Sequence, residues 1–402
     1  MASNKKYQWL LIGLLSANFG IVFFDRNAFS FLAPFLQPEL KLTNTQIGLI
    51  GAAFSFAWAI AGLAMGSISD RFGRRKTILV VATLVFSLAS VLSGMASTFI
   101  MLMGARMLMG IAEGGIMPIT QTLIAAEVPP ERRGLAHGIT QNFGANLIAN
   151  FLGPIIIVAV ANEVGWRNAF YLVALPGFLM GLLIALLVRE PHELDNRPKP
   201  TFAQAMQLLR DRTMLACVLV STLLVAYLLV FSLFLPLYLV QVKGIATQQM
   251  SWIMSSFGLA SIAIAFIVPG LSDRIGRRPV AVVASLLGVF IPLGTLFITG
   301  DSLWPYYLAF AAGAAISGVF PLAMATVPSE IVPPGLTATA LSLTMGISEI
   351  IGGVFAPSIA GKVADLQGLA STQWMLIGLA IATSLFALML RETAPAVLAR
   401  RR

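Results

Sequence analysis

Long runs of apolar residues, each followed by a short polar segment, repeat along the whole chain. Each run can form a membrane-spanning helix, which needs about 20 mostly apolar residues, and no alternating pattern of a membrane strand accompanies them. The pattern predicts spanning helices near residues 9–35, 46–68, 77–96, 99–122, 135–160, 168–188, 214–240, 249–271, 279–298, 303–325, 336–358 and 372–390. We therefore expect an all-α membrane protein with twelve transmembrane helices.

The longest polar stretch, residues 189–213, lies near the midpoint of the chain. It separates the first six predicted helices, within residues 1–188, from the last six, within residues 214–402. The sequence predicts two six-helix bundles joined by a cytoplasmic linker.

Composition and charge agree with a membrane location. Of the 402 residues, 58% are hydrophobic and 11% are charged, whereas a soluble domain has about 25% charged residues. Twenty of the 26 Lys and Arg residues fall in loops on one side of the predicted helices and four on the other. By the positive-inside rule both termini are cytoplasmic, in a cell (inner or plasma) membrane. Basic loops facing anionic lipid explain the net charge of +9 better than a nucleic-acid partner does.

The two halves of the chain repeat one another. The segment SDRFGRRK at residues 69–76 returns as SDRIGRRP 203 residues later, and the shift from Glu127 to Glu330 is again 203. The shift from Arg189 to Arg391 is 202. Two-fold internal repeats are typical of secondary transporters that rock around a site between their halves.

The loop GSISDRFGRRK, residues 66–76, resembles the signature loop of the major facilitator superfamily, and its weaker copy has Pro269 in place of the first glycine. The resemblance implies a major facilitator fold of two pseudo-symmetric bundles. It also implies a gating role on the cytoplasmic side for Gly66, Asp70, Arg71, Arg74, Arg75, Asp273, Arg274 and Arg277. The alternative is that these charges only set the topology.

Five ionisable residues lie inside predicted spans: Asp25, Arg26, Arg106, Glu113 and Glu349. A charge at the bilayer centre costs roughly 2.5–3.5 kcal/mol on insertion scales, so such residues usually face a cavity and mark a substrate or proton path. Arg106 and Glu113 are seven residues apart, hence on one helix face about 10 Å from each other. The depths of Asp25 and Arg106 are similar, so we expect them to form an ion pair, with Arg26 on a neighbouring face.

The four charges of the first half suggest a mechanism. Asp25, Glu113, Arg26 and Arg106 sum to zero when all are ionised, so protonation of one acid leaves a positive site that favours an anion. Arginine suits this task because its planar fork grips a carboxylate at two points. The alternative is two structural ion pairs that hold the first and fourth helices together.

The segments FFDRNAFSFLAPFL and GARMLMGIAEGGIMP are similar to the anion:cation symporter family of that superfamily. The resemblance implies that Asp25 and Glu113 are protonation sites, that Arg26 meets the substrate carboxylate and that Arg106 couples the two events. The family commonly has Ala-Pro after the glutamate, where this chain has Gly114-Gly115. Spinster-type lipid transporters share the same pattern, so these motifs do not choose between the two.

Further polar residues in the spans are candidates for substrate contacts. Asn142, Asn146 and Asn150 are spaced by four and form one stripe, which either lines a cavity for a hydroxylated substrate or bonds helices together. Glu349 is a second proton site, a substrate ligand or a structural hydrogen-bonding group. Tyr227 and Gln241 would complete a polar wall.

The sequence thus predicts a proton-coupled symporter of a small organic anion, such as a sugar acid, working by alternating access. The alternatives are a proton-driven exporter of lysolipids or drug-like amphiphiles and a non-transporting sensor. No nucleophile–base constellation is visible, so we do not expect an enzyme. No nucleotide-binding loop occurs, and the chain has two histidines and one cysteine, so we expect neither a cofactor nor a metal. The expected partners are the anion, protons and the bilayer, with the protein acting as a monomer.

Overall fold

The computed structural model describes residues 5–72, 74–129, 132–133, 136, 138–190, 206–300, 302–333 and 336–400. Within these residues, twelve helices are long and apolar enough to cross a membrane. This confirms the all-α architecture with twelve spans that the apolar runs predict.

In the described residues, nine helical elements make up the first six spans. Kinked spans are made of consecutive elements, such as α4 followed by α5. The elements are α1 (Lys5–Glu39), α2 (Asn44–Phe72), α3 (Arg75–Gly94), α4 (Phe99–Gly114), α5 (Ile116–Glu127), η1 (Ile139–Phe143), η2 (Ala145–Leu152), α7 (Gly153–Val164) and α8 (Trp166–Leu187).

The last six spans are interrupted more often, and η6 in the eleventh span is a π-helical turn, a feature often found at functional sites. The elements are α10 (Arg212–Gln241), α11 (Thr247–Ile275), α12 (Arg277–Leu287), α13 (Phe290–Phe297), α14 (Trp304–Gly313), η3 (Ala314–Gly318), α15 (Val319–Pro321), η4 (Leu322–Thr326), α16 (Val327–Ile331), α17 (Thr337–Ser348), η6 (Glu349–Phe355), α18 (Ala356–Gln367) and α19 (Ala370–Ala387). A short helix, α20 (Pro395–Arg400), follows the last span.

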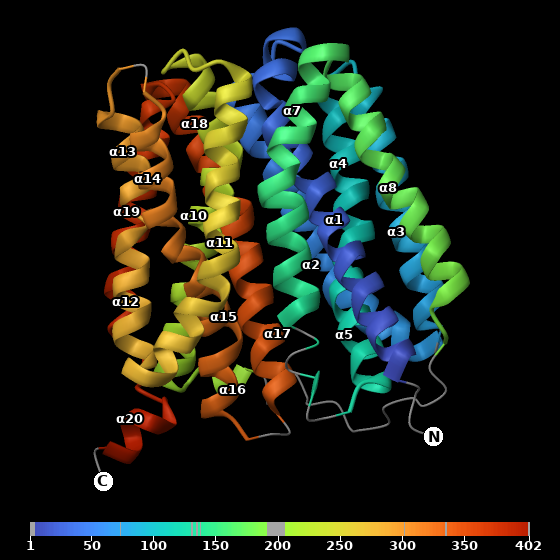
Figure 1. Cartoon of the computed structure of the whole chain (residues 1–402), viewed down its shortest axis with the longest axis vertical. Coiled ribbons are helices and arrows are strands. Elements are labelled where there is room, and N and C mark those ends of the chain that lie inside the picture. The colour runs from blue at the N-terminus through green and yellow to red at the C-terminus, as the bar shows by residue number, and fades with distance from the viewer. Residues whose placement is uncertain are drawn as a thin grey trace.

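The two halves of the chain lie side by side, the first from blue to green and the second from yellow to red (Figure 1). Helix α1 begins and α20 ends at the same end of the molecule, at the bottom of the view. We refer to the opposite end as the far end. Residues 191–205 of the predicted linker lie outside the described residues, so the proposed division at 189–213 stays a prediction.

The internal repeat extends to matching helix caps. The backbone N–H of Lys76, in the first turn of α3, donates to Oε1 of Glu190 at 3.1 Å. In the second half, the backbone N–H groups of Arg277 and Arg278 donate to Glu392 at 2.8 and 3.3 Å. A carboxylate at a helix N-terminus satisfies free N–H groups there, so both copies hold the start of a span in the same way.

Glycines allow helices α2 and α4 to pack closely. A Cβ added to Gly110 would lie 2.5 Å from the carbonyl oxygen of Phe54. One added to Gly114 would overlap the carbonyl oxygen of Trp58 and lie 2.8 Å from the backbone nitrogen of Gly62. Small residues at such crossings let backbones approach one another inside a membrane. This crossing fixes where α4 holds Arg106 and Glu113 relative to α2.

The halves contact each other at the far end through α2 and α18. A Cβ on Gly48 would overlap the carbonyl oxygen of Pro357, and a Cβ on Gly361 would overlap that of Asn44. Asp365 of α18 accepts hydrogen bonds from the backbone N–H groups of Asn44 and Thr45, both at 2.8 Å, and from the Thr45 hydroxyl at 2.5 Å. The first turn of α2 is therefore capped by a carboxylate from the other half.

Replacing Asp365 with alanine removes this cap. We expect a loss of about 0.5–2 kcal/mol of stability, the usual range for an N-cap, seen as a lower midpoint of thermal unfolding in detergent. The exposed Glu163 at the end of α7 gives a matched control, Glu163→Gln, which should leave the midpoint unchanged. Equal midpoints for Asp365→Ala and the control would show that the cap does not stabilise the contact between the halves.

Candidate functional site

Helix α1 turns its two consecutive charges to different sides, because successive residues of a helix are about 100° apart. Asp25 is fully buried, and neither of its carboxylate oxygens accepts a hydrogen bond from the described residues. Arg26 keeps 13% of its side chain exposed and faces the second half of the chain. The two residues thus have separate surroundings despite their adjacency.

Arg106 of α4 is buried against α1 and α2. Its Nη2 donates to the backbone carbonyl of Arg26 at 2.7 Å, and its Nη1 lies 3.0 Å from the sulfur of Met109. The centre of the guanidinium is 5.3 Å from the Phe29 ring centre and 5.2 Å from that of Phe54. The expected Asp25–Arg106 ion pair is therefore not formed, because the guanidinium bonds the carbonyl one residue further along α1.

Glu113 lies in the last turn of α4, next to the close crossing with α2. It is 1% exposed, and neither carboxylate oxygen accepts a hydrogen bond within the described part of the chain. Among the residues that the structure describes, Asp25 and Glu113 are thus both buried acids whose oxygens accept no hydrogen bond. The expectation that these acids face open space is not met in this conformation, since Asp25 is 0% and Glu113 1% exposed. An ionised carboxylate without a partner is costly in such a place.

Arg26 and Glu349 form an ion pair between the halves, with Nη2 3.2 Å from Oε1. Glu349 begins η6 and keeps 10% of its side chain exposed. The Arg26 guanidinium also lies over an aromatic group from α1 and α2, at 5.5 Å from the ring centre of Phe23, 4.7 Å from that of Phe54 and 5.9 Å from that of Trp58. Glu349 is thus brought to the charges of the first half.

A chain of amides joins α1 to η2. Asn27 donates to the side-chain oxygen of Asn150 at 3.0 Å, and Asn150 donates to that of Asn146 at 3.1 Å. The asparagine stripe therefore makes an interhelical hydrogen bond to α1, which is one of the two roles that the sequence predicts for it. The side chain of Asn142 lies outside the described residues.

Tyr227 and Gln241 make their hydrogen bonds away from the charged residues of α1, α4 and η6. The hydroxyl of the fully buried Tyr227 donates to the carbonyl of Gly288 at 2.7 Å, within the second half. Gln241 is exposed at the far end and donates to Gln37 of α1 at 2.8 Å. The prediction that these two residues complete a polar wall of the substrate site is therefore corrected. Tyr227 bonds within its own half, and Gln241 lies at the far end, away from Arg26 and Glu349.

The first copy of the predicted gating loop is only partly described. Gly66, Asp70 and Arg71 lie in the part of the loop for which the structure does not describe side-chain surroundings. Arg74 is exposed directly before α3, and Arg75 is 3% exposed in its first turn. The gating role of this loop stays a prediction.

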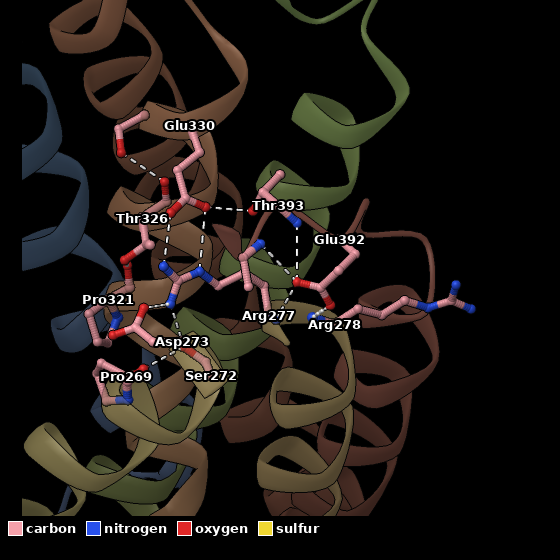
Figure 2. A network of polar contacts seen from close by, with 12 residues as sticks. Pro269, Ser272, Asp273, Arg277, Arg278, Pro321, Thr326, Glu330, Glu392 and Thr393 are labelled. Atoms are coloured by element: carbon pink, nitrogen blue, oxygen red, sulfur yellow. Dashed lines mark hydrogen bonds and ion pairs between the residues drawn. The ribbon is translucent and has the colours of Figure 1, made fainter. Parts of the chain in front are cut away.

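In the second copy, Arg277 lies at the centre of a polar network (Figure 2). Its guanidinium contacts Asp273 at 2.5 Å, Glu330 at 2.9 Å and the hydroxyl of Ser272 at 2.6 Å. These residues connect α11, α12 and α16, all within the second half. Arg274 is exposed. The network holds helices of one bundle together, and its part in gating stays a prediction.

Comparison with known proteins identifies the fold family. The sequence profile of the Major Facilitator Superfamily matches residues 15–357. The chain belongs to this superfamily. It is a multi-pass membrane protein of the Major Facilitator Superfamily type, and its relatives are transporters.

Two curated members of the Major Facilitator Superfamily are similar along most of their length. A "probable 4-methylmuconolactone transporter" of Cupriavidus pinatubonensis is 30% identical over 91% of this chain and 83% of its own. The hexuronate transporter of Bacillus subtilis is 27% identical over 96% of this chain and 94% of its own. Among solved structures, a bacterial homologue of the human lysosomal transporter Spinster, in an inward-facing and unoccupied conformation, superimposes with a TM-score of 0.78 at 20% identity, covering 99% of this chain and 98% of its own.

The sequence did not point to three residues that contact the charged or amide groups of the site: Asn27, Phe54 and Trp58. Asn27 directly follows the charged pair of α1, and this position could have indicated that its amide belongs to the same polar group. Phe54 and Trp58 are ordinary apolar positions of α2 in the sequence. Their contacts with Arg26 of α1 and Arg106 of α4 depend on how α1, α2 and α4 pack together, which the sequence alone does not reveal.

Proposed function

We propose that this protein is a proton-coupled symporter of a small organic anion, working by alternating access. The observation that carries the proposal is the combination of two buried acids with two arginines in the same helices. The carboxylate oxygens of these acids, Asp25 and Glu113, accept no hydrogen bond from the described residues. A neutral acid beside guanidinium groups leaves net positive charge, and this favours an anion. Proton uptake and anion binding then support each other.

The proposed roles follow from exposure. Asp25 and Glu113 take up protons, and Arg106 couples this uptake to anion binding; all three are buried within the first half. Arg26 binds the substrate carboxylate, since it keeps accessible surface where the halves meet. The amides of Asn146 and Asn150 lie in the adjoining hydrogen-bonded chain and suit hydroxyl groups of the substrate. The relatives named for hexuronate and 4-methylmuconolactone support a small organic acid as the class.

For the orientation, we propose that both termini are cytoplasmic in a bacterial inner membrane, as the distribution of Lys and Arg favours. The far end then faces the outside, and the Asp365 cap closes that side of the path. Protons and substrate would enter when α2 and α18 separate there.

Uptake by the purified protein in proteoliposomes tests this function. The panel contains D-glucuronate, succinate, 4-hydroxybenzoate and 4-methylmuconolactone, with an inward proton gradient imposed by a pH jump. We expect at least one anion to accumulate above its outside concentration and a protonophore to abolish the accumulation. Transport that ignores the gradient, or movement of lysolipids or cationic dyes alone, would contradict the proposal.

A further inference from the structure

The ion pair between Arg26 and Glu349 raises the question of how an anion reaches Arg26. Glu349 is the carboxylate that contacts this guanidinium among the described residues. Asp25, its neighbour in α1, makes no such contact. Arg26 therefore has a counter-ion from the opposite half of the molecule.

The aromatic group of the first half fixes the guanidinium and leaves its donors available. Phe54 and Trp58 of α2 and Phe23 of α1 lie 4.7–5.9 Å from the guanidinium carbon. A guanidinium has five N–H donors in one plane. Within the described part of the chain, one of its nitrogens bonds Glu349. The contact is single rather than two-pronged, so an incoming carboxylate that engages two donors of Arg26 can replace it.

The opposite wall gives the Glu349 carboxylate a defined place. A Cβ added to Gly353, four residues later in η6, would lie 3.2 Å from Oε1 of Glu349 and 3.0 Å from the Cβ of Ser55 in α2. A Cβ on Gly352 would overlap the carbonyl oxygen of Thr222 in α10. The two glycines thus let η6 approach both α2 and α10, which brings Glu349 to Arg26.

We propose that Glu349 is an internal counter-anion, which occupies on Arg26 the place of a substrate carboxylate and is displaced when the substrate binds. Two carboxylates on one guanidinium would repel each other, so the pair must open for the anion. In the empty carrier Glu349 links the halves across their interface, and in the loaded carrier the substrate takes over that link. The inference rests on the proposed function only in taking Arg26 as the anion site.

Displacement has a consequence for substrate class. The released carboxylate remains in the wall formed by η6, close to the bound anion. A second negative charge on the substrate would meet it, whereas hydroxyl groups could donate to it. The site should therefore accept singly charged hydroxylated acids in preference to dicarboxylates.

Binding of acetate to the purified protein tests the inference without knowledge of the natural substrate. Thermal unfolding is followed during titration with acetate up to about 100 mM, with acetamide as the neutral control. In Glu349→Gln, the freed Arg26 should bind acetate about tenfold more tightly than in the wild type. The Arg26→Gln/Glu349→Gln double variant should lose this gain. The same substitution should raise the affinity for succinate by a larger factor than the affinity for acetate.

A second variant protects the test against misfolding. Glu349→Asp keeps the negative charge but moves it away from Arg26 by the length of one methylene group. The acetate affinity should therefore rise, but by less than in Glu349→Gln. Equal acetate affinity in the wild type and both single variants, or weaker affinity in the variants, would overturn the inference. A gain in acetate binding without any gradient-driven uptake would instead contradict the proposed function and leave Glu349 as the counter-anion.

Discussion

Replacing Glu113 with glutamine should abolish gradient-driven uptake, down to the level of empty vesicles, while counterflow exchange of substrate continues. Glutamine has nearly the same shape but takes up no proton at neutral pH. Exchange needs only that the loaded carrier reorients, whereas accumulation needs a proton carried in the same cycle. The measurement compares uptake of a transported anion under a pH gradient with its exchange at equal pH on both sides.

The exposed Glu163 gives a control in the same half of the chain. Glu163→Gln should retain both activities. If Glu113→Gln loses exchange as well as uptake while substrate binding is intact, Glu113 does more than carry a proton. If it retains accumulation, the proton-handling role assigned to this residue is wrong.

Replacing Gly114 with alanine should destabilise the protein and reduce uptake strongly. Its new methyl group would overlap the backbone carbonyl of Trp58, and backbone at a helix crossing moves only if the helices separate. Overpacking costs about 1–3 kcal/mol, against a gain of up to about 1 kcal/mol from the better helix propensity of alanine. We expect a lower midpoint of thermal unfolding, and a still lower one for Gly114→Val.

Helix α4 contains its own control for this experiment. A Cβ on Gly104 would meet no described atom within 4 Å, so Gly104→Ala should keep uptake and match or exceed the wild-type midpoint. If Gly114→Ala behaves like Gly104→Ala, the close crossing of α2 and α4 does not set the geometry of Arg106 and Glu113.

The membrane itself explains why the fold could be predicted. In a bilayer the backbone must satisfy its own hydrogen bonds, so each apolar run of sufficient length becomes a helix. The charges of α1 and α4 stand out from such runs for the same reason. The glycine that replaces alanine after Glu113 was a departure in the sequence, and the contact of Gly114 with Trp58 gives its physical cause.

The partners of those charges could not be predicted in the same way. Depth along two helices suggested that Asp25 and Arg106 would pair, but depth does not fix how each helix is rotated. Arg106 instead bonds a backbone carbonyl, which has no signature in the sequence. The cap that Asp365 gives to α2 is equally hidden, because the helix start and its capping residue are about 320 positions apart.

The distance along the chain between Arg26 and Glu349 has a consequence for synthesis. The two residues are separated by 323 positions. At about 5–20 residues per second, the ribosome adds the glutamate roughly 15–65 s after the arginine. During that time the nascent first half holds a guanidinium whose acidic partner does not yet exist, and the rings of Phe23, Phe54 and Trp58 are the contacts available to shelter it. A first half expressed alone would keep Arg26 without this ion-pair partner.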